Sequence, residues 1–256
     1  MLLKVVVTPA LITGATLVGR RWGHALSGWL VGLPLTSGPV VFFLALDQGR
    51  HFAANASLGV ILGVASQAVF ALAYVWSGRA TGWPLRLLAG TAAFGAATAH
   101  FRFARMPAIV EPILVVGCLV PALPLMPRGE QLANRVPAGP PGDLPMRIVV
   151  ATALVLGLTT VAPYLGSYLS GLVMPFPLYA AILAVFAHRL AGPAAAATVW
   201  RGLLLGLFSF LTFFTVLAGT LVPLGIAPAF LLAVAAAVTV QGASLMMIRP
   251  PVRSAN

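Results

Sequence analysis

The stretch that decides the fold is Gly49-Arg-His-Phe-Ala-Ala-Asn-Ala-Ser-Leu-Gly59-Val-Ile-Leu-Gly63. Its glycine spacing occurs again 143 positions later, in Gly192-Pro-Ala-Ala-Ala-Ala-Thr-Val-Trp-Arg-Gly202-Leu-Leu-Leu-Gly206. The same gapless offset relates Lys4-Val-Val-Val to Arg147-Ile-Val-Val. It also joins the pairs Gly14 and Gly157, Gly23 and Gly166, Gly28 and Gly171, Pro34 and Pro177, Ser66 and Ser209, and Phe70 and Phe213. With 26 glycines in 256 residues, composition alone would produce far fewer matches. The chain therefore contains an internal duplication, and in a membrane protein the relation between two repeats points towards function.

The composition places this duplicated chain in a membrane. Hydrophobic residues make up 60% of it and charged residues 7%, with a mean hydropathy of +1.02, whereas soluble domains carry about 25% charged residues. In hydrocarbon, backbone groups must be satisfied within helices or closed barrels. The continuous apolar runs lack the alternation of barrel strands. The expected fold class is therefore all-α, that of a polytopic membrane protein.

Nine transmembrane helices are predicted from the apolar runs. They cover residues 2–19, 25–46, 52–77, 84–101, 107–126, 146–165, 167–187, 194–219 and 223–248. The first run looks like a secretory signal, but its copy lies in the middle of the chain, so we interpret it as a retained helix. The polar stretch 127–145 is rich in Pro and Gly and is predicted to be an exposed linker.

Three parts of the chain follow from this assignment. Residues 1–101 form the first four-helix repeat, residues 102–145 the linking helix with its cytoplasmic linker, and residues 146–256 the second repeat with a short tail. Because an odd number of helices separates equivalent positions, the second copy is expected to be inverted relative to the first.

The distribution of positive charge supports this inversion independently. Cations flank the first and third loops of the first copy, at Arg20, Arg21, Arg79 and Arg86, whereas Arg189 and Arg201 lie around the middle loop of the second. Lys and Arg collect on the cytoplasmic side. The protein is therefore expected in a bacterial inner membrane, with its N-terminus outside and its C-terminus in the cytoplasm. Lys4, Arg102 and Arg105 are exceptions to the charge rule.

One segment of the second repeat reads Tyr164-Leu-Gly-Ser-Tyr-Leu-Ser-Gly-Leu-Val-Met-Pro-Phe-Pro-Leu-Tyr-Ala-Ala-Ile-Leu-Ala-Val-Phe-Ala-His188, and the predicted helix from Gly202 to Phe214 follows it. Together they resemble the GlpM family of small bacterial inner-membrane proteins. Those are short four-helix chains with a similar Ala-Gly-Leu-Val-Pro-x-Phe-Pro turn. The first repeat matches more loosely, with Gly32-Leu-Pro-Leu-Thr-Ser-Gly-Pro39 at this turn. The resemblance implies a fused antiparallel pseudo-dimer, and it defines architecture better than activity.

Proline interrupts the second predicted helix of each copy, at Pro34 and Pro39 and again at Pro175 and Pro177. Proline removes a hydrogen-bond donor and clashes with the preceding turn. The freed backbone groups are tolerated at membrane depth only beside protein or a water-filled cavity. Two broken helices of opposite direction would then meet near the midplane, where secondary transporters bind substrate or ions. The alternative is that these prolines only kink the helices.

The candidate substrate-binding residues are the prolines and the hydroxyl and amide side chains near them: Pro34, Thr36, Ser37, Ser66, Gln67, Pro177, Tyr179, Ser209 and Thr212. Thr36 and Tyr179 occupy the same repeat position, so a pseudo-twofold axis brings them together if either faces it. For Ser66, Gln67, Ser209 and Thr212, hydrogen bonding between helices is the alternative to lining a cavity.

Two charged residues within predicted helices also need an interpretation. Glu111 is a candidate coupling or gating residue, because an ionisable side chain inside a membrane costs free energy and usually has a function. The alternatives for Glu111 are solvation at the outer interface or pairing with Arg102 or Arg105. Arg201 is expected to snorkel to the cytoplasmic headgroups, and contact with an anionic substrate is its alternative.

Several classes of function are disfavoured by what the sequence lacks. One cysteine, Cys118, four histidines without ligand spacing and four acidic residues do not build a metal site. Neither a phosphate-binding loop nor a dinucleotide motif is present, so no cofactor and no catalytic residue is expected. The net charge of +11 lies beside membrane segments, which favours anionic lipids over nucleic acid as partners.

The sequence thus predicts a passive or ion-coupled transporter for a small molecule or ion, acting as a monomeric pseudo-dimer or as a homo-oligomer. The alternative is an accessory or scaffold membrane protein that supports another complex. A transporter should have polar residues facing a cavity at the repeat interface, whereas a scaffold should pack that interface dry.

Overall fold

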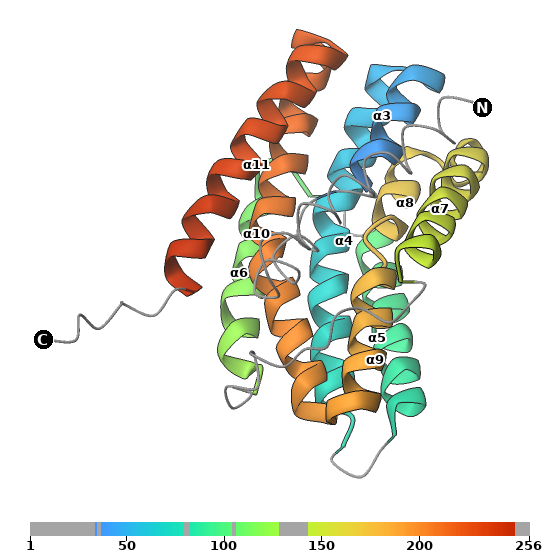
Figure 1. Ribbon diagram of the computed structural model, residues 1–256. Coiled ribbons are helices and arrows are strands. Elements are labelled where there is room, and N and C mark those ends of the chain that lie inside the picture. Colours follow the sequence, from blue (N-terminus) through green and yellow to red (C-terminus); the bar gives the residue numbers. More distant parts are fainter. Residues whose placement is uncertain (1–33, 35–36, 79–81, 104–105, 128–142, 249–256) are drawn as a thin grey trace, which may run out of the picture.

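The computed structural model describes residues 34, 37–78, 82–103, 106–127 and 143–248 (Figure 1). Within these residues the regular structure is helical and no strand occurs, as expected for an all-α protein. The helices are α3 (Ser37–Asp47), α4 (Arg50–Trp76), α5 (Trp83–Phe103), α6 (Val110–Leu125), α7 (Asp143–Leu165), α8 (Ser167–Val173), α9 (Leu178–Ala191), α10 (Pro193–Leu224) and α11 (Ile226–Ile248). The predicted helix 2–19, the first part of helix 25–46 and most of the linker lie outside the described residues.

Four helical segments in the described ranges are long and apolar enough to cross a membrane. They are Arg50–Trp76, Ser167–Ala191, Pro193–Leu224 and Ile226–Ala243. Shorter apolar helices cover Ser37–Asp47, Val110–Leu125 and Val155–Leu165. These segments make the protein a helical membrane protein, while the count of nine spans stays a prediction.

Helix α4 lies at the centre of the bundle. It contacts α3, α5, α6, α8 and α10, and Figure 1 shows it between α10 on one side and α8 and α9 on the other. Its apolar residues surround the whole helix, which is typical of a helix buried on every side. Helices α6 and α11 instead expose apolar side chains such as Ile113 and Leu231. In a membrane, those outer faces contact lipid.

Helices α4 and α10 run antiparallel. The Arg50 guanidinium at the start of α4 donates from Nη1 to the carbonyl oxygen of Val222, in the last turn of α10, over 3.2 Å. Near the opposite ends of the same two helices, the Trp200 ring packs against Phe70 and Tyr74, with centroid separations of 5.0 and 5.2 Å. The first turn of each helix therefore lies beside the last turns of the other.

The helix starts repeat at the offset found in the sequence. Helices α4 and α10 begin at residues 50 and 193, and α5 and α11 begin at residues 83 and 226, so both differences are 143. Gly49 and Gly192, which precede the first pair, have φ values of 89° and 84°. This left-handed region costs glycine little and other residues more. The two glycines thus end one helix and start the next by the same turn.

Glycines bring α4 and α8 into backbone contact. A Cβ atom added at Gly59 would lie 2.1 Å from the Tyr168 carbonyl oxygen, and one added at Gly171 would lie 1.9 Å from the Ala56 carbonyl oxygen. Small residues allow such close approach between membrane helices. The Gly59-x-x-x-Gly63 spacing on α4 is therefore a close helix contact, and it fixes α8 against α4. The matching spacing at Gly202 and Gly206 predicts a similar contact for α10.

Candidate functional site

The second copy contains a complete interruption between two helices. Helix α8 ends at Val173 and α9 begins at Leu178, and the predicted prolines, Pro175 and Pro177, lie between them. Two short turns carry the chain across, because Phe176 N–H donates to the Val173 carbonyl at 3.1 Å and Leu178 N–H donates to the Phe176 carbonyl at 2.8 Å. This segment is a break with its own hydrogen bonds, and the simple kink that we considered as the alternative does not describe it.

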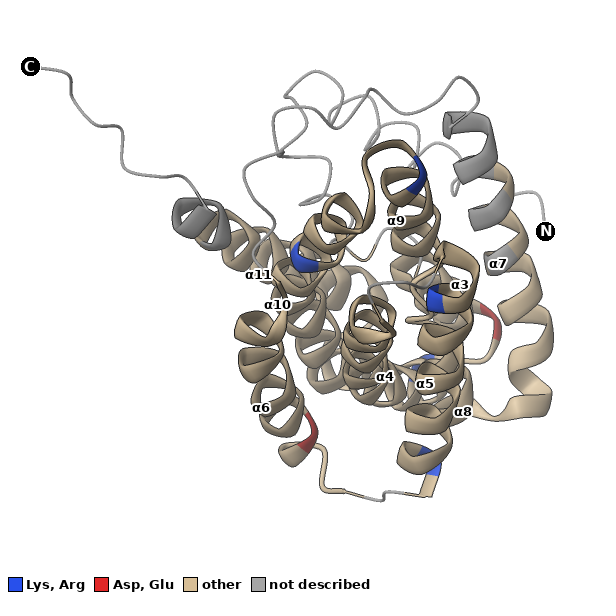
Figure 2. Cartoon of the chain, turned by 90° about the horizontal axis from the view of Figure 1, so that it is seen from below, with Lys and Arg blue, Asp and Glu red and all other residues tan. Residues whose placement is uncertain are grey.

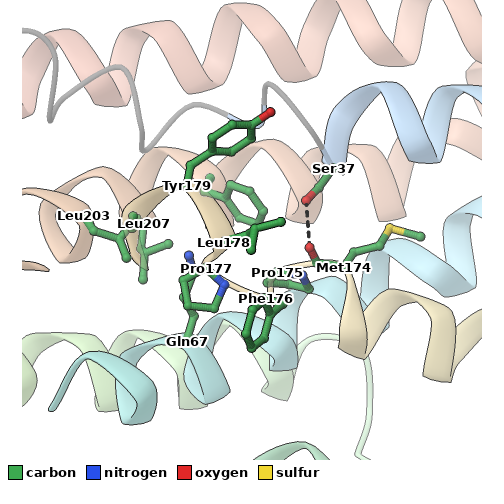
Figure 3. Close-up of a pocket in the computed structure, with 12 residues that line it drawn as sticks. Ser37, Gln67, Met174, Pro175, Phe176, Pro177, Leu178, Tyr179, Leu203 and Leu207 are labelled. Carbon is green, nitrogen blue, oxygen red and sulfur yellow. Dashed lines mark hydrogen bonds between the residues drawn. The ribbon is translucent and has the colours of Figure 1, made fainter. Parts of the chain in front are cut away.

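The proline segment of the first copy lies against this break. Helix α3 begins at Ser37, and Gly38 N–H donates to the Pro34 carbonyl at 2.8 Å. The Ser37 hydroxyl donates to the Met174 carbonyl oxygen at 3.4 Å (Figure 3). Ser37 and the segment 174–177, which are far apart in sequence, therefore meet. Thr36 lies outside the described residues.

A small cavity opens at this meeting point. Its described lining comprises Ser37, Gln67, Met174, Pro175, Phe176, Pro177, Leu178, Tyr179, Ala180, Leu203, Leu207 and Phe210. Its volume is about 40 Å³, and about 10–15 Å³ is enough to hold one water. The cavity therefore has room for a few waters or one small ion, and it is too small for an organic molecule of several non-hydrogen atoms. Four predicted residues, Ser37, Gln67, Pro177 and Tyr179, line it together.

Gln67 brings a polar side-chain atom without a described hydrogen-bond partner to the cavity. It is 6% exposed, and no described residue forms a hydrogen bond with its Oε1 atom. Figure 3 shows its side chain beside Pro177, and Leu203 and Leu207 line the same space. Because a buried polar group without a partner costs free energy, the Gln67 amide is suited to bind water or a ligand in the cavity.

The remaining candidate side chains do not line the cavity. Ser209 donates its hydroxyl to the Ala237 carbonyl of α11 at 2.8 Å, which is the hydrogen bond between helices that we considered as its alternative. Thr212 donates to the Phe208 carbonyl of its own helix at 2.8 Å. Ser66 is buried, and its hydroxyl has no hydrogen-bond partner in the described part of the chain. Pro34 packs near Gly38.

Glu111 lies in the first turn of α6 and is only 2% exposed. Its Oε1 atom accepts the Tyr168 hydroxyl at 3.4 Å, and its Oε2 atom has no partner within the described ranges. Solvation at the outer interface, one of the expected alternatives, is therefore wrong. Arg102, another alternative, lies over the Phe103 ring at 5.7 Å, and Arg105 is not among the described residues.

Three arginines bind helix C-terminal carbonyls rather than a ligand. Arg201 donates from Nη1 to the Leu123 carbonyl at 3.0 Å. In a continued helix this carbonyl would accept from the N–H of residue 127, but Pro127 has no N–H. Arg50 and Arg86 donate in the same way to the last turns of α10 and α4. Cations stabilise the negative ends of helices. Figure 2 shows how few charged residues the described helices carry.

Sequence patterns alone did not identify Phe210 or the Tyr168 partner of Glu111. The repeat offset contains the signal for Phe210, because this residue is the counterpart of Gln67 (67 and 210 differ by 143), and both line the cavity. No pattern indicated Tyr168, because its contact depends on how α6 is placed beside α8.

Comparisons of the chain with protein-family models, curated proteins and solved structures gave no match. The resemblance to GlpM therefore rests on the Met-Pro-Phe-Pro turn and its surroundings alone.

Proposed function

We propose that this protein is a bacterial inner-membrane transporter, passive or ion-coupled, for a small solute or ion. Its site is the cavity where Ser37 of the first copy meets residues 174–177 of the second. The observation that carries the proposal is the hydrogen bond between Ser37 and Met174, which joins the two proline segments beside the buried Gln67 amide. Broken helices that meet within a membrane are a recurrent way to build a substrate site.

The proposed architecture is nine transmembrane helices in two inverted four-helix repeats with α6 as the linking helix. Its support is the antiparallel packing of α4 against α10 and the equal spacing of their starts and of the starts of α5 and α11. On this architecture the N-terminus lies outside and the C-terminus in the cytoplasm. The arginines at the cytoplasmic ends would contact anionic lipids, and one chain acts as a pseudo-dimer.

The break also suggests how the site would open. Helix α8 is fixed to α4 by its glycine contact, while α9 packs against α10. Residues 174–177 therefore connect a helix attached to the first repeat with a helix attached to the second. Rocking of one repeat against the other would bend the chain at this point and separate Ser37 from Met174, which opens the cavity towards one side.

Removal of the break tests the proposal. Replacing Pro177 alone would leave Pro175, whose ring excludes a regular helix, so the informative variant is Pro175→Ala/Pro177→Ala. We expect it to insert normally and to lose whichever of the chloride, potassium and glycerol fluxes the native protein shows in liposomes. Native-like flux through this variant would place the site elsewhere, and the absence of all three fluxes from the native protein would favour the scaffold alternative.

Glu111 is the proposed coupling or gating residue. It joins the linking helix to Tyr168, at the start of the helix that ends at the break. If the carboxyl group couples transport to protons, Glu111→Gln should remove the acceleration of flux by a pH gradient while flux without a gradient persists. Gating instead predicts equal changes in both conditions, and Tyr168→Phe should then have the same effect. If neither variant alters flux in either condition, the pair is structural.

A further inference from the structure

We infer that the cavity is selective for small inorganic anions of halide size. This inference rests on the proposed transport function and names the substrate class of the same site. It follows from the helix ends that meet at the cavity, from the hydrogen-bonding groups already used there, and from the buried amide of Gln67.

Two helices begin at the cavity. Ser37 is the first described residue of α3 and Leu178 the first residue of α9, and both line the cavity. These helices have 11 and 14 residues, so each has a developed dipole with about half a positive charge at its N-terminus. Backbone amides at such ends bind anions. Gly38 N–H bonds to Pro34, Leu178 N–H to Phe176 and Ala181 N–H to Pro177, so both helices contribute mainly their fields. The Ala180 N–H of α9 is an additional backbone donor.

The negative end of α8 also lies at the cavity, but several of its carbonyl groups already accept hydrogen bonds. Ser170 and Gly171 accept from Met174 N–H, Val173 accepts from Phe176 N–H, and Met174 accepts the Ser37 hydroxyl. In the first turn of α9, by contrast, no described residue accepts the Ala180 N–H. The Ala180 N–H is therefore a backbone donor available at the break.

Gln67 is an independent sign of a ligand. Its side chain is more than nine-tenths buried, it lines the cavity, and its Oε1 atom is unpaired within the described residues. A glutamine amide carries two donors, and the two ends of the amide differ only in how oxygen and nitrogen are assigned. In the opposite assignment the amide presents N–H groups to the same space, as an anion requires.

The absence of charge from the described lining decides between ions of opposite sign. None of the twelve lining residues is acidic or basic. A cation would meet two positive helix ends without a carboxylate to offset them. An anion would meet helix ends, the Ala180 N–H and the Gln67 amide, without an arginine or lysine that would hold it too tightly to leave. The volume of about 40 Å³ suits an ion of halide size better than larger carboxylates and oxyanions.

Chloride efflux tests the inference directly. The purified full-length protein is placed in liposomes loaded with potassium chloride and diluted into potassium gluconate with valinomycin, and external chloride is followed with an electrode. We expect efflux well above that of empty liposomes. Gln67→Leu should lower the efflux about ten-fold or more, since hydrogen bonds to a charged group are the stronger ones. Gln241→Leu is the matched control, because Gln241 is buried on α11 and does not line the cavity, and its efflux should stay near native.

Charge reversal at the same position supplies a second test. Gln67→Glu changes the size of the side chain little, and it should abolish chloride flux and increase potassium flux measured without valinomycin. If the native protein carries potassium or glycerol but no chloride, the anion inference is overturned while transport stands. If it carries none of the three, both proposals fail. Equal losses of efflux in Gln67→Leu and Gln241→Leu, or chloride flux that survives in Gln67→Glu, would also overturn the anion site.

Discussion

Helices α4 and α10 occupy equivalent positions in the repeat, yet only α4 brings a polar side chain to the cavity. Both follow a glycine with positive φ and both pack along the other helix. At the cavity, however, α4 has Gln67 where α10 has Phe210. Under the proposed duplication, the backbone frame of the two helices is alike while the side chains at the site differ. The two proposed halves would then share a scaffold and differ in chemistry.

The largest expected effect concerns the shared frame. Gly59→Leu places a side chain where the Tyr168 carbonyl lies, and overpacking of this kind costs about 3 kcal/mol or more when backbone is the obstacle. If α10 uses its glycines as α4 does, Gly202→Leu should cost a similar amount. Thermal unfolding of both variants in detergent should show melting temperatures well below that of the native protein.

Gly157→Leu is the control for this pair, because Gly157 is exposed and has no atom within 4 Å of an added Cβ. Its melting temperature should stay near native. A stable Gly202→Leu beside an unstable Gly59→Leu would break the comparison, since close glycine packing would then belong to one half only.

An intermediate effect is expected from exchanging the divergent pair. Gln67→Phe should lower chloride flux about ten-fold or more, because it removes the cavity amide and fills the space. The double variant Gln67→Phe/Phe210→Gln returns an amide to the cavity from the opposite helix. Efflux measurements should show that it recovers a substantial part of the flux. If the double variant stays as inactive as the single one, the positions are not equivalent around the cavity.

The smallest effect separates Ser66 from Ser209. Ser209→Ala removes a hydrogen bond to α11 and should destabilise the protein by about 0.6–1 kcal/mol. Ser66→Ala removes a buried hydroxyl without a described partner and should change stability by only a few tenths of a kcal/mol or raise it slightly. Denaturation of both variants under the same detergent conditions gives the comparison. A larger loss for Ser66→Ala would mean that its hydroxyl has a partner after all.

Much of the fold follows from the sequence because apolar runs and glycine or proline breaks are local signals. The helix predicted at 52–77 corresponds to α4 at residues 50–76. The interruption predicted at Pro175 and Pro177 falls between Val173 and Leu178. The sequence also predicts that the two proline segments meet. Ser37, beside the first segment, contacts Met174 at the second, while the twofold symmetry between the repeats stays a prediction. These features depend on composition and residue spacing, which can be read from a single sequence.

The side chains that line the cavity were harder to predict, because helical geometry separates neighbours in sequence. Consecutive residues on a helix point about 100° apart. Gln67 therefore lines the cavity while the adjacent Ser66 does not. Thr212 satisfies its hydroxyl within its own turn, an outcome that sequence does not distinguish from lining a site. The partner of Glu111 depends on the placement of α6, which no periodicity specifies.

Opposite insertion of the two halves is the central claim, and equivalent exposed positions at helix ends test it most directly. Gln48 and Ala191 are both exposed, and they differ by 143 positions. In a Cys118→Ala background, Gln48→Cys and Ala191→Cys are labelled separately with a membrane-impermeant maleimide in right-side-out vesicles. The inverted architecture predicts that the cysteine at position 48 reacts from outside, whereas the one at position 191 reacts only after the vesicles are opened. Labelling of both positions from the same side would contradict it.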